Sequence, residues 1–198
     1  MFFKLMQSLL RVILNTFYDV EIKGEENLPE DGSVIVCANH MSALDPLLLG
    51  AFIKRPLCFM AKHEIFIFPP LGWIVSKLGA FPVNRNSVEI TSIKRALEVL
   101  KNGKAMGIFA QGGRDVSVIT EDSGKAGVAL FAVRGRSPVV PVGIKGSFIP
   151  FTRLIINMGK PMYFEEENMG KKFKAADLSV LTKKIMLEIK RLSEQEYA

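Results

Sequence analysis

The chain has 198 residues and an apolar content of 48%, which is ample for one buried core and excludes a chain that is disordered along its length. The formal net charge is +6, and residues 54–114 hold ten Lys and Arg against three Glu. This excess suits a phosphate-bearing substrate, an anionic membrane, nucleic acid or a solvated helix face. Cys37 and Cys58 lie in apolar runs without a metal-ligand spacing, so we expect buried, reduced thiols and no metal site.

The first 17 residues show the spacing of an amphipathic helix with a wide apolar face, because polar residues fall at positions 4, 7, 8, 11 and 15, among others. A membrane-spanning helix needs about 20 mostly apolar residues, and these polar residues interrupt the run. No small-residue cleavage site of the kind that ends a signal peptide follows. We therefore expect residues 1–18 to lie in a membrane interface, with packing on the domain formed by residues 19–198 as the alternative.

Apolar strands alternate with helical patterns from residue 33 onward. Strands are expected at 33–39, 57–62, 79–85, 105–110, 138–146 and 153–159, and helices at 46–54, 87–101, 124–135 and 178–195. This alternation predicts an α/β fold: a single domain with a mixed, largely parallel sheet flanked by helices.

A second apolar stretch, residues 65–75, contains Pro69 and Pro70, which forbid a regular helix through it. We interpret it as a surface loop that dips into lipid or lines an acyl-chain site, or as part of the core.

His40 follows the first expected strand and stands five residues before Asp45. If both lay on one helix, five residues would rotate their side chains about 140° apart, so they meet only if the chain bends between them. The change from strand to helix before Pro46 supplies such a bend. The pair then forms a base and its orienting carboxylate, or Asp45 merely caps the helix, with Ser42 resembling the start of a capping box.

Three further stretches follow expected strands. Gln111, two glycines and Arg114 come after 105–110, where glycine backbone N–H groups and a guanidinium suit an anion. Arg85 ends the strand at 79–85, and the apolar run at 140–144 would ordinarily be core.

Together these stretches resemble the glycerolipid acyltransferase family, which includes the lysophosphatidate acyltransferases. The family's blocks are matched in order by Asn39, His40, Ser42 and Asp45; by Gly79, Val83 and Arg85; by Phe109, Gly112 and Arg114; and by Val140 to Val142. Lys62 and Glu64, with Lys125 and Gly127, match further family elements, so the resemblance spans residues 20–146.

The resemblance implies transfer of a fatty acyl group from acyl-CoA or acyl-carrier protein to a lysophospholipid, most simply 1-acylglycerol 3-phosphate. It implies that His40 is the general base and that Asp45 orients it. The implied substrate-binding residues are Arg85, Gln111, Gly112, Arg114, Lys62 and Lys125. No cofactor is implied beyond the acyl donor, and the implied partner is a lipid surface at the cytoplasmic face of the cell membrane.

The third block departs from the family, because Gln111 replaces its Glu and Gly113 its Thr. The change removes a charge and a hydroxyl near the implied acceptor. Glycerol 3-phosphate or another lysolipid therefore stays open as the acceptor, as does a non-catalytic lipid-binding relative. A nucleic-acid-binding module is not expected, because the chain carries no recognition motif.

Overall fold

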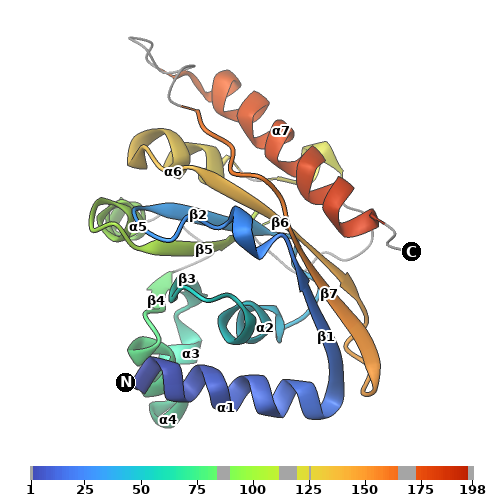
Figure 1. Cartoon of the computed structure of the whole chain (residues 1–198). Coiled ribbons are helices and arrows are strands. Elements are labelled where there is room, and N and C mark those ends of the chain that lie inside the picture. The colour runs from blue at the N-terminus through green and yellow to red at the C-terminus, as the bar shows by residue number, and fades with distance from the viewer. Residues whose placement is uncertain (1, 84–89, 112–119, 125, 165–172, 196–198) are drawn as a thin grey trace.

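The computed structural model describes residues 2–83, 90–111, 120–124, 126–164 and 173–195 (Figure 1). Seven strands form one sheet in the order β1-β7-β6-β2-β5-β3-β4. Their bounds are β1 Tyr18–Lys23, β2 Val34–Ala38, β3 Leu57–Lys62, β4 Phe81–Val83, β5 Ala105–Phe109, β6 Val139–Gly146 and β7 Thr152–Met158. Among the strand pairs of the described residues, only β6–β7 is antiparallel, which confirms the predicted mixed, largely parallel α/β fold.

Helices cover both faces of the sheet (Figure 1). α1 (Phe2–Phe17) and α2 (Asp45–Phe52) pack on one face, whose core includes Leu14, Leu48 and Phe52. α5 (Ile90–Lys101), α6 (Gly127–Gly135) and α7 (Ala175–Glu194) pack on the other, whose core includes Leu100, Phe131 and Ile185. Short 3-10 turns lie at Glu25–Asn27 and Glu121–Ser123.

The central strand β2 serves both cores, because all five of its residues are buried. Val34, Val36 and Ala38 face the α1–α2 core, and Ile35 and Cys37 face the α5–α7 core. This alternation follows from the two-residue period of a strand, and burial on both faces explains the unbroken apolar run.

The order in which the chain adds strands to the sheet switches sides between β2 and β5, which are neighbouring parallel strands. After β2 it passes through α2 to β3 on one side, and after β5 it passes through α6 to β6 on the other. Open α/β sheets bind ligands at such a switch point, outside the carboxyl ends of the strands. The loop containing His40 and the residues after Phe109 both begin there.

Two expectations need correction. The edge strand β1 was not predicted, although Tyr18, Val20 and Ile22 alternate with charged residues in the period-two pattern of a half-exposed strand. The stretch 65–75 is not a loop, because α3 (Glu64–Ile67) is followed by α4 (Pro69–Lys77). Proline breaks a helix only in its interior, and here the two prolines occupy the first turn of α4, where no N–H is needed.

α1 confirms the expected N-terminal helix. None of the described helices is both long and apolar enough to cross a membrane.

Candidate active site

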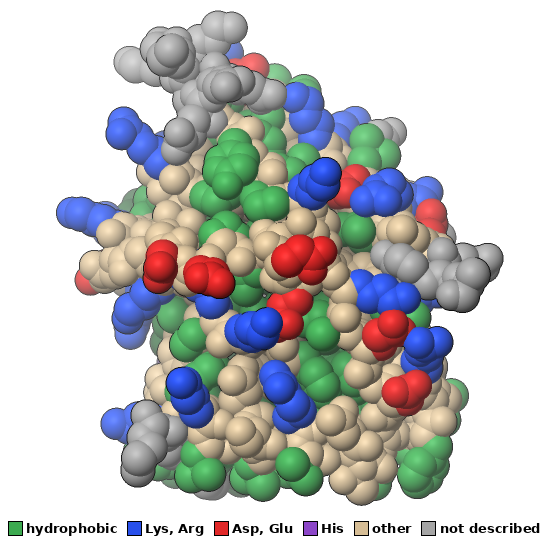
Figure 2. Space-filling view, in the orientation of Figure 1, with side chains coloured by type: hydrophobic (Ala, Val, Ile, Leu, Met, Phe, Trp, Pro, Cys, Tyr) green, Lys and Arg blue, Asp and Glu red, His purple; other side chains and the backbone are tan. Residues whose placement is uncertain are grey.

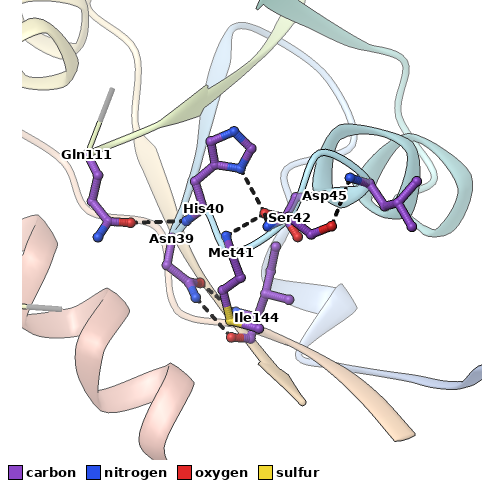
Figure 3. Close-up of polar contacts among 8 residues, drawn as sticks. Asn39, His40, Met41, Ser42, Asp45, Gln111 and Ile144 are labelled. Carbon is purple, nitrogen blue, oxygen red and sulfur yellow. Dashed lines mark hydrogen bonds and ion pairs between the residues drawn. The ribbon is translucent and has the colours of Figure 1, made fainter. Parts of the chain in front are cut away.

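The chain bend after β2 brings His40 and Asp45 together. His40 lies in the loop that follows Ala38, Asp45 is the first residue of α2, and His40 Nδ1 lies 2.8 Å from Asp45 Oδ2 (Figure 3). Both side chains are buried, His40 with 5% and Asp45 with 0% of its surface exposed. With the carboxylate as acceptor, Nδ1 is the donor of this hydrogen bond, and Nε2 is the ring nitrogen left to accept a proton. Figure 3 shows Nε2 directed away from Asp45.

Asp45 does not cap α2, contrary to the simpler alternative. The residue before the helix is Leu44, and none of the described side chains makes a capping hydrogen bond at this end. The Asp45 carboxylate turns back instead, and its Oδ2 accepts the backbone N–H groups of Met41 at 2.6 Å and Ser42 at 2.8 Å. Ser42 Oγ accepts the N–H of Leu44 at 3.2 Å, which tightens the same loop. The loop is therefore folded around the carboxylate that orients the histidine.

An aromatic stack supports the imidazole from beneath. The ring of His40 is stacked on Phe109 with a centroid distance of 4.1 Å, and Phe109 is stacked on Phe59 at 5.9 Å. Gly107 makes room for this arrangement, because a Cβ there would lie 2.3 Å from the Phe59 ring. An aromatic face carries partial negative charge, so it favours a positive imidazolium above it.

Asn39, the residue before His40, is held by two hydrogen bonds to the neighbouring strand β6. Its Nδ2 donates to the carbonyl of Ile144 at 2.9 Å, and its Oδ1 accepts the Ile144 N–H at 2.7 Å. The amide thereby replaces a backbone pair just where the ladder between β2 and β6 ends at Ala38 and Val142. The side chain is fully buried, so both bonds are shielded from water.

Among the expected substrate-binding residues, Gln111 is the one that the structure places beside His40. Its Oε1 accepts the backbone N–H of His40 at 3.1 Å, and it is 9% exposed (Figure 3). Lys62 lies at the carboxyl end of β3, exposed, with an ion pair to Glu64 at 2.8 Å. The other expected substrate-binding residues, Arg85, Gly112, Arg114 and Lys125, lie outside the described residues.

Phe59 belongs to this site but was not predicted from the sequence. The one signal for it was Gly107, since a glycine inside a strand marks a close approach by another group. Nothing in the sequence spacing shows which group approaches.

Chemically, the arrangement is that of a general base. A neutral imidazole whose Nδ1–H is held by a buried carboxylate accepts a proton at Nε2, and the carboxylate then stabilises the imidazolium. Its place at the switch point of a parallel sheet is typical of enzymes that bind their substrates at the carboxyl ends of the strands.

Comparison with known proteins agrees with the interpretation of this site as that of an enzyme. A family model described as "Acyltransferase" matches residues 19–145. The 1-acyl-sn-glycerol-3-phosphate acyltransferase of Bacillus subtilis (strain 168) is 33% identical over 145 residues, which cover 73% of this chain and 71% of the relative. The protein of the same name from Borreliella burgdorferi is 28% identical over 145 residues, and the match spans 58% of its length.

The fold agrees with a solved structure as well. The crystal structure of the 1-acyl-sn-glycerophosphate (LPA) acyltransferase PlsC from Thermotoga maritima matches with a TM-score of 0.78 and 25% identity, covering 99% of this chain and 81% of that one. The chain belongs to the acyltransferase family, as the motif resemblance implied.

Proposed function

We propose that the chain transfers a fatty acyl group from acyl-CoA or acyl-carrier protein to the free hydroxyl of 1-acylglycerol 3-phosphate, giving phosphatidate. The observation that carries the proposal is the buried contact of His40 Nδ1 with Asp45 Oδ2, which leaves Nε2 to accept a proton. The two bacterial relatives and the matching solved structure, all described as acyltransferases of 1-acyl-sn-glycerol 3-phosphate, support the acceptor.

In the proposed reaction His40 Nε2 removes the proton of the acceptor hydroxyl as its oxygen attacks the thioester carbonyl. Asp45 stabilises the imidazolium that forms. When the tetrahedral intermediate collapses, the carbon–sulfur bond breaks and the departing thiolate takes the proton from His40. The acyl donor is a co-substrate, and we propose no further cofactor.

Four cationic residues complete the proposed site. Arg85 and Arg114, with Lys62 and Lys125, bind the phosphate of the acceptor or of the donor, because a guanidinium grips phosphate with two hydrogen bonds and an ammonium adds a point charge. Gln111 keeps a carbonyl acceptor where the family has a carboxylate, and this carbonyl holds the His40 backbone.

The acceptor is tested with a panel of lysophosphatidate, glycerol 3-phosphate and lysophosphatidylcholine, each offered in vesicles with acyl-CoA or acyl-carrier protein. We expect lysophosphatidate to have the highest kcat/KM. Higher kcat/KM for another acceptor would overturn the head-group assignment and implicate the Gln111 and Gly113 replacements. Absence of transfer to every acceptor would support a lipid-binding protein instead.

The proposed lipid partner is supported by an exposed apolar surface from three segments. On α1 the outward face shows Leu5, Leu9 and Val12, which are 66%, 50% and 65% exposed. Further exposed apolar side chains come from the α3–α4 segment and from the turn after β6, namely Ile67, Phe68, Trp73, Ile149 and Phe151. Figure 1 shows α1 and α4 along its lower side, with the turn between β6 and β7 at the lower right, and hydrophobic side chains line the lower edge of Figure 2.

The turn after β6 is continuous with α1. The N–H of Phe151 donates to the carbonyl of Phe17, the last residue of α1, at 2.6 Å. Phe151 adopts a left-handed backbone with φ 68 and is 84% exposed, an uncommon combination for a bulky residue. A surface that is apolar and aromatic suits the interface of a bilayer. We therefore propose peripheral or monotopic binding at the cytoplasmic face of the cell membrane.

Vesicle sedimentation tests this surface. Leu9→Asp and Val12→Asp place a charge on the outward apolar face of α1, and each should weaken binding about tenfold or more, because about 1.5–3 kcal/mol of apolar burial is lost. Asn15→Asp adds the same charge at an exposed polar position of the same helix and should leave binding within about twofold. Equal effects of all three changes would refute the proposed face.

A further inference from the structure

Two polar residues of α1, the half-buried Gln7 and the exposed Arg11, reach the end of the helix that carries Asp45. Gln7 Nε2 donates to the carbonyl of Gly50 at 3.0 Å and to that of Ile53 at 2.7 Å. Both carbonyls belong to the last turn of α2 or to the residue that ends it. Gln7 therefore joins α1 to α2 through the backbone rather than through side-chain packing.

Arg11 lies one helical turn further along α1 and completes the contact. Its Nε and Nη2 donate to the carbonyl of Ala51 at 3.1 and 3.0 Å, and Nη2 lies 3.5 Å from the carbonyl of Phe52. Its guanidinium carbon lies 5.4 Å from the centre of the Phe52 ring. Gln7 and Arg11 thus reach four consecutive carbonyls at the carboxyl end of α2.

These are the carbonyls that a helix cannot satisfy within itself. The carboxyl end of a helix also carries partial negative charge, which a cation stabilises. Gln7 and Arg11 therefore act together as a carboxyl-terminal cap for α2 that is supplied by another element.

The opposite end of α2 is the catalytic end. α2 has eight residues, so about 12 Å separates the cap from Asp45. Leu48 and Leu49 are buried between the two ends. A short helix held in a packed core moves as a rigid body, so a shift at one end displaces the other. Asp45 Oδ2 tolerates little displacement, since three N–H donors meet it at 2.6 to 2.8 Å.

We propose that Gln7 and Arg11 are positioning residues for acyl transfer: by capping α2 they hold Asp45 in register with His40. The inference rests on the proposed function of the His40–Asp45 pair. It also gives α1 two distinct faces, one with the outward apolar side chains proposed to enter lipid and one that fixes the catalytic helix. The same helix then links contact with the lipid to order in the site.

The test uses the full chain with Gln7→Met, Arg11→Met and the double variant, which keep an unbranched apolar stem and remove the donors. Ser8→Met is the matched control, because it places the same side chain at an exposed position of the same helix. Arg11→Lys retains a cation and is the conservative variant. The readouts are kcat and KM for lysophosphatidate in vesicles, vesicle sedimentation, and the low-field proton resonance of His40 Nδ1–H.

For the double variant we expect kcat to fall about tenfold or more, with KM and vesicle binding within about twofold of wild type. The Nδ1–H resonance should broaden or shift, Arg11→Lys should restore part of kcat, and Ser8→Met should match wild type. The single variants carry the same test if the double variant does not fold.

Unchanged kcat and an unchanged resonance in both Met variants would overturn the inference. A fall in kcat that merely parallels a loss of vesicle binding, or that Ser8→Met reproduces, would overturn it as well. If wild type transferred no acyl group but the resonance still changed in the Met variants, the proposed function would fail while the positioning role stood.

Discussion

Asp45 holds its two carboxylate oxygens in unequal surroundings. Oδ2 accepts three N–H donors, from the ring of His40 and the backbones of Met41 and Ser42. Oδ1 is buried and has no hydrogen-bond partner among the described residues. One oxygen therefore fixes both the loop and the ring, and the negative charge sits where an imidazolium would form.

Asp45→Asn separates shape from charge at this point. An amide oxygen can still accept from the three donors, but the imidazolium loses its counter-charge. We expect kcat to fall by about 10²–10⁴, by analogy with the carboxylate of hydrolytic triads, with a smaller change in KM. Steady-state kinetics and thermal melting check this, and a fully folded Asn variant with wild-type kcat would remove Asp45 from the mechanism.

Phe109→Leu tests the stack beneath the imidazole. The Phe109 ring is stacked on both the His40 ring and the Phe59 ring, whereas Phe59 is stacked on Phe109. We expect both Phe109→Leu and Phe59→Leu to lower the free energy of unfolding by about 1 kcal/mol, with the larger fall in kcat for Phe109→Leu. Urea unfolding and kcat are measured on each variant; an equal fall in kcat for the two would show that the stack acts only through stability.

Whether a helix or strand could be predicted from the sequence depended on how fully it is buried. The central strand β2 was predictable because its two buried faces leave an unbroken apolar run. The prolines of α4 led to the wrong prediction of a loop, because residue preference alone does not say whether a proline lies in the first turn of a helix or interrupts its interior. The edge strand β1 contains charged residues at every second position and was overlooked, although its alternation was present.

In the candidate site, too, some contacts could be predicted from the sequence and others could not. The meeting of His40 and Asp45 was predictable from the bend between strand and helix, since both partners are close in sequence. The contact of Arg11 with α2 was not, because a helical pattern gives an angle around the axis and not the neighbour that lies there. The bond from the His40 N–H to Gln111 likewise depends on the pairing of β2 with β5, which are distant in sequence.

Asn39→Leu tests the side-chain hydrogen bonds that join the carboxyl end of β2 to β6. The substitution leaves the N–H and the carbonyl of Ile144 buried without the side-chain partner, so the free energy of unfolding should fall by about 2–4 kcal/mol. Asn157→Leu is the control, because Asn157 is equally buried but donates one bond, to the Leu192 carbonyl, and its Oδ1 lacks a partner among the described residues. Urea unfolding should show the smaller loss for Asn157→Leu, and the reverse order would contradict the account.

At the scale of the whole molecule, the two cysteines report on the integrity of the core. Burial raises the pKa of both thiols above the ordinary value of 9.0, and Cys37 is the more deeply buried. A thiol whose pKa is raised by folding stabilises the fold below the unfolded pKa, and that stability is lost as the pH rises above it. The free energy of unfolding should therefore fall as the pH rises above about 9.

Alkylation by iodoacetamide at pH 8, followed by mass spectrometry, checks the same point without a change of fold. We expect slow labelling of the native chain, slowest at Cys37, and rapid labelling of both thiols in urea. Native labelling at the rate of a free thiol would contradict the burial of either cysteine.

The whole fold places α1 between the proposed lipid surface and α2, and α2 between α1 and His40. The proposed chemistry still depends on one side chain. The most direct measurement is phosphatidate formation from acyl-CoA and lysophosphatidate in vesicles by wild type and His40→Ala. We predict acyl transfer by wild type and a fall of about 10³ or more in kcat for His40→Ala, with melting temperature and vesicle binding retained. A His40→Ala protein as active as wild type would contradict the account at its centre.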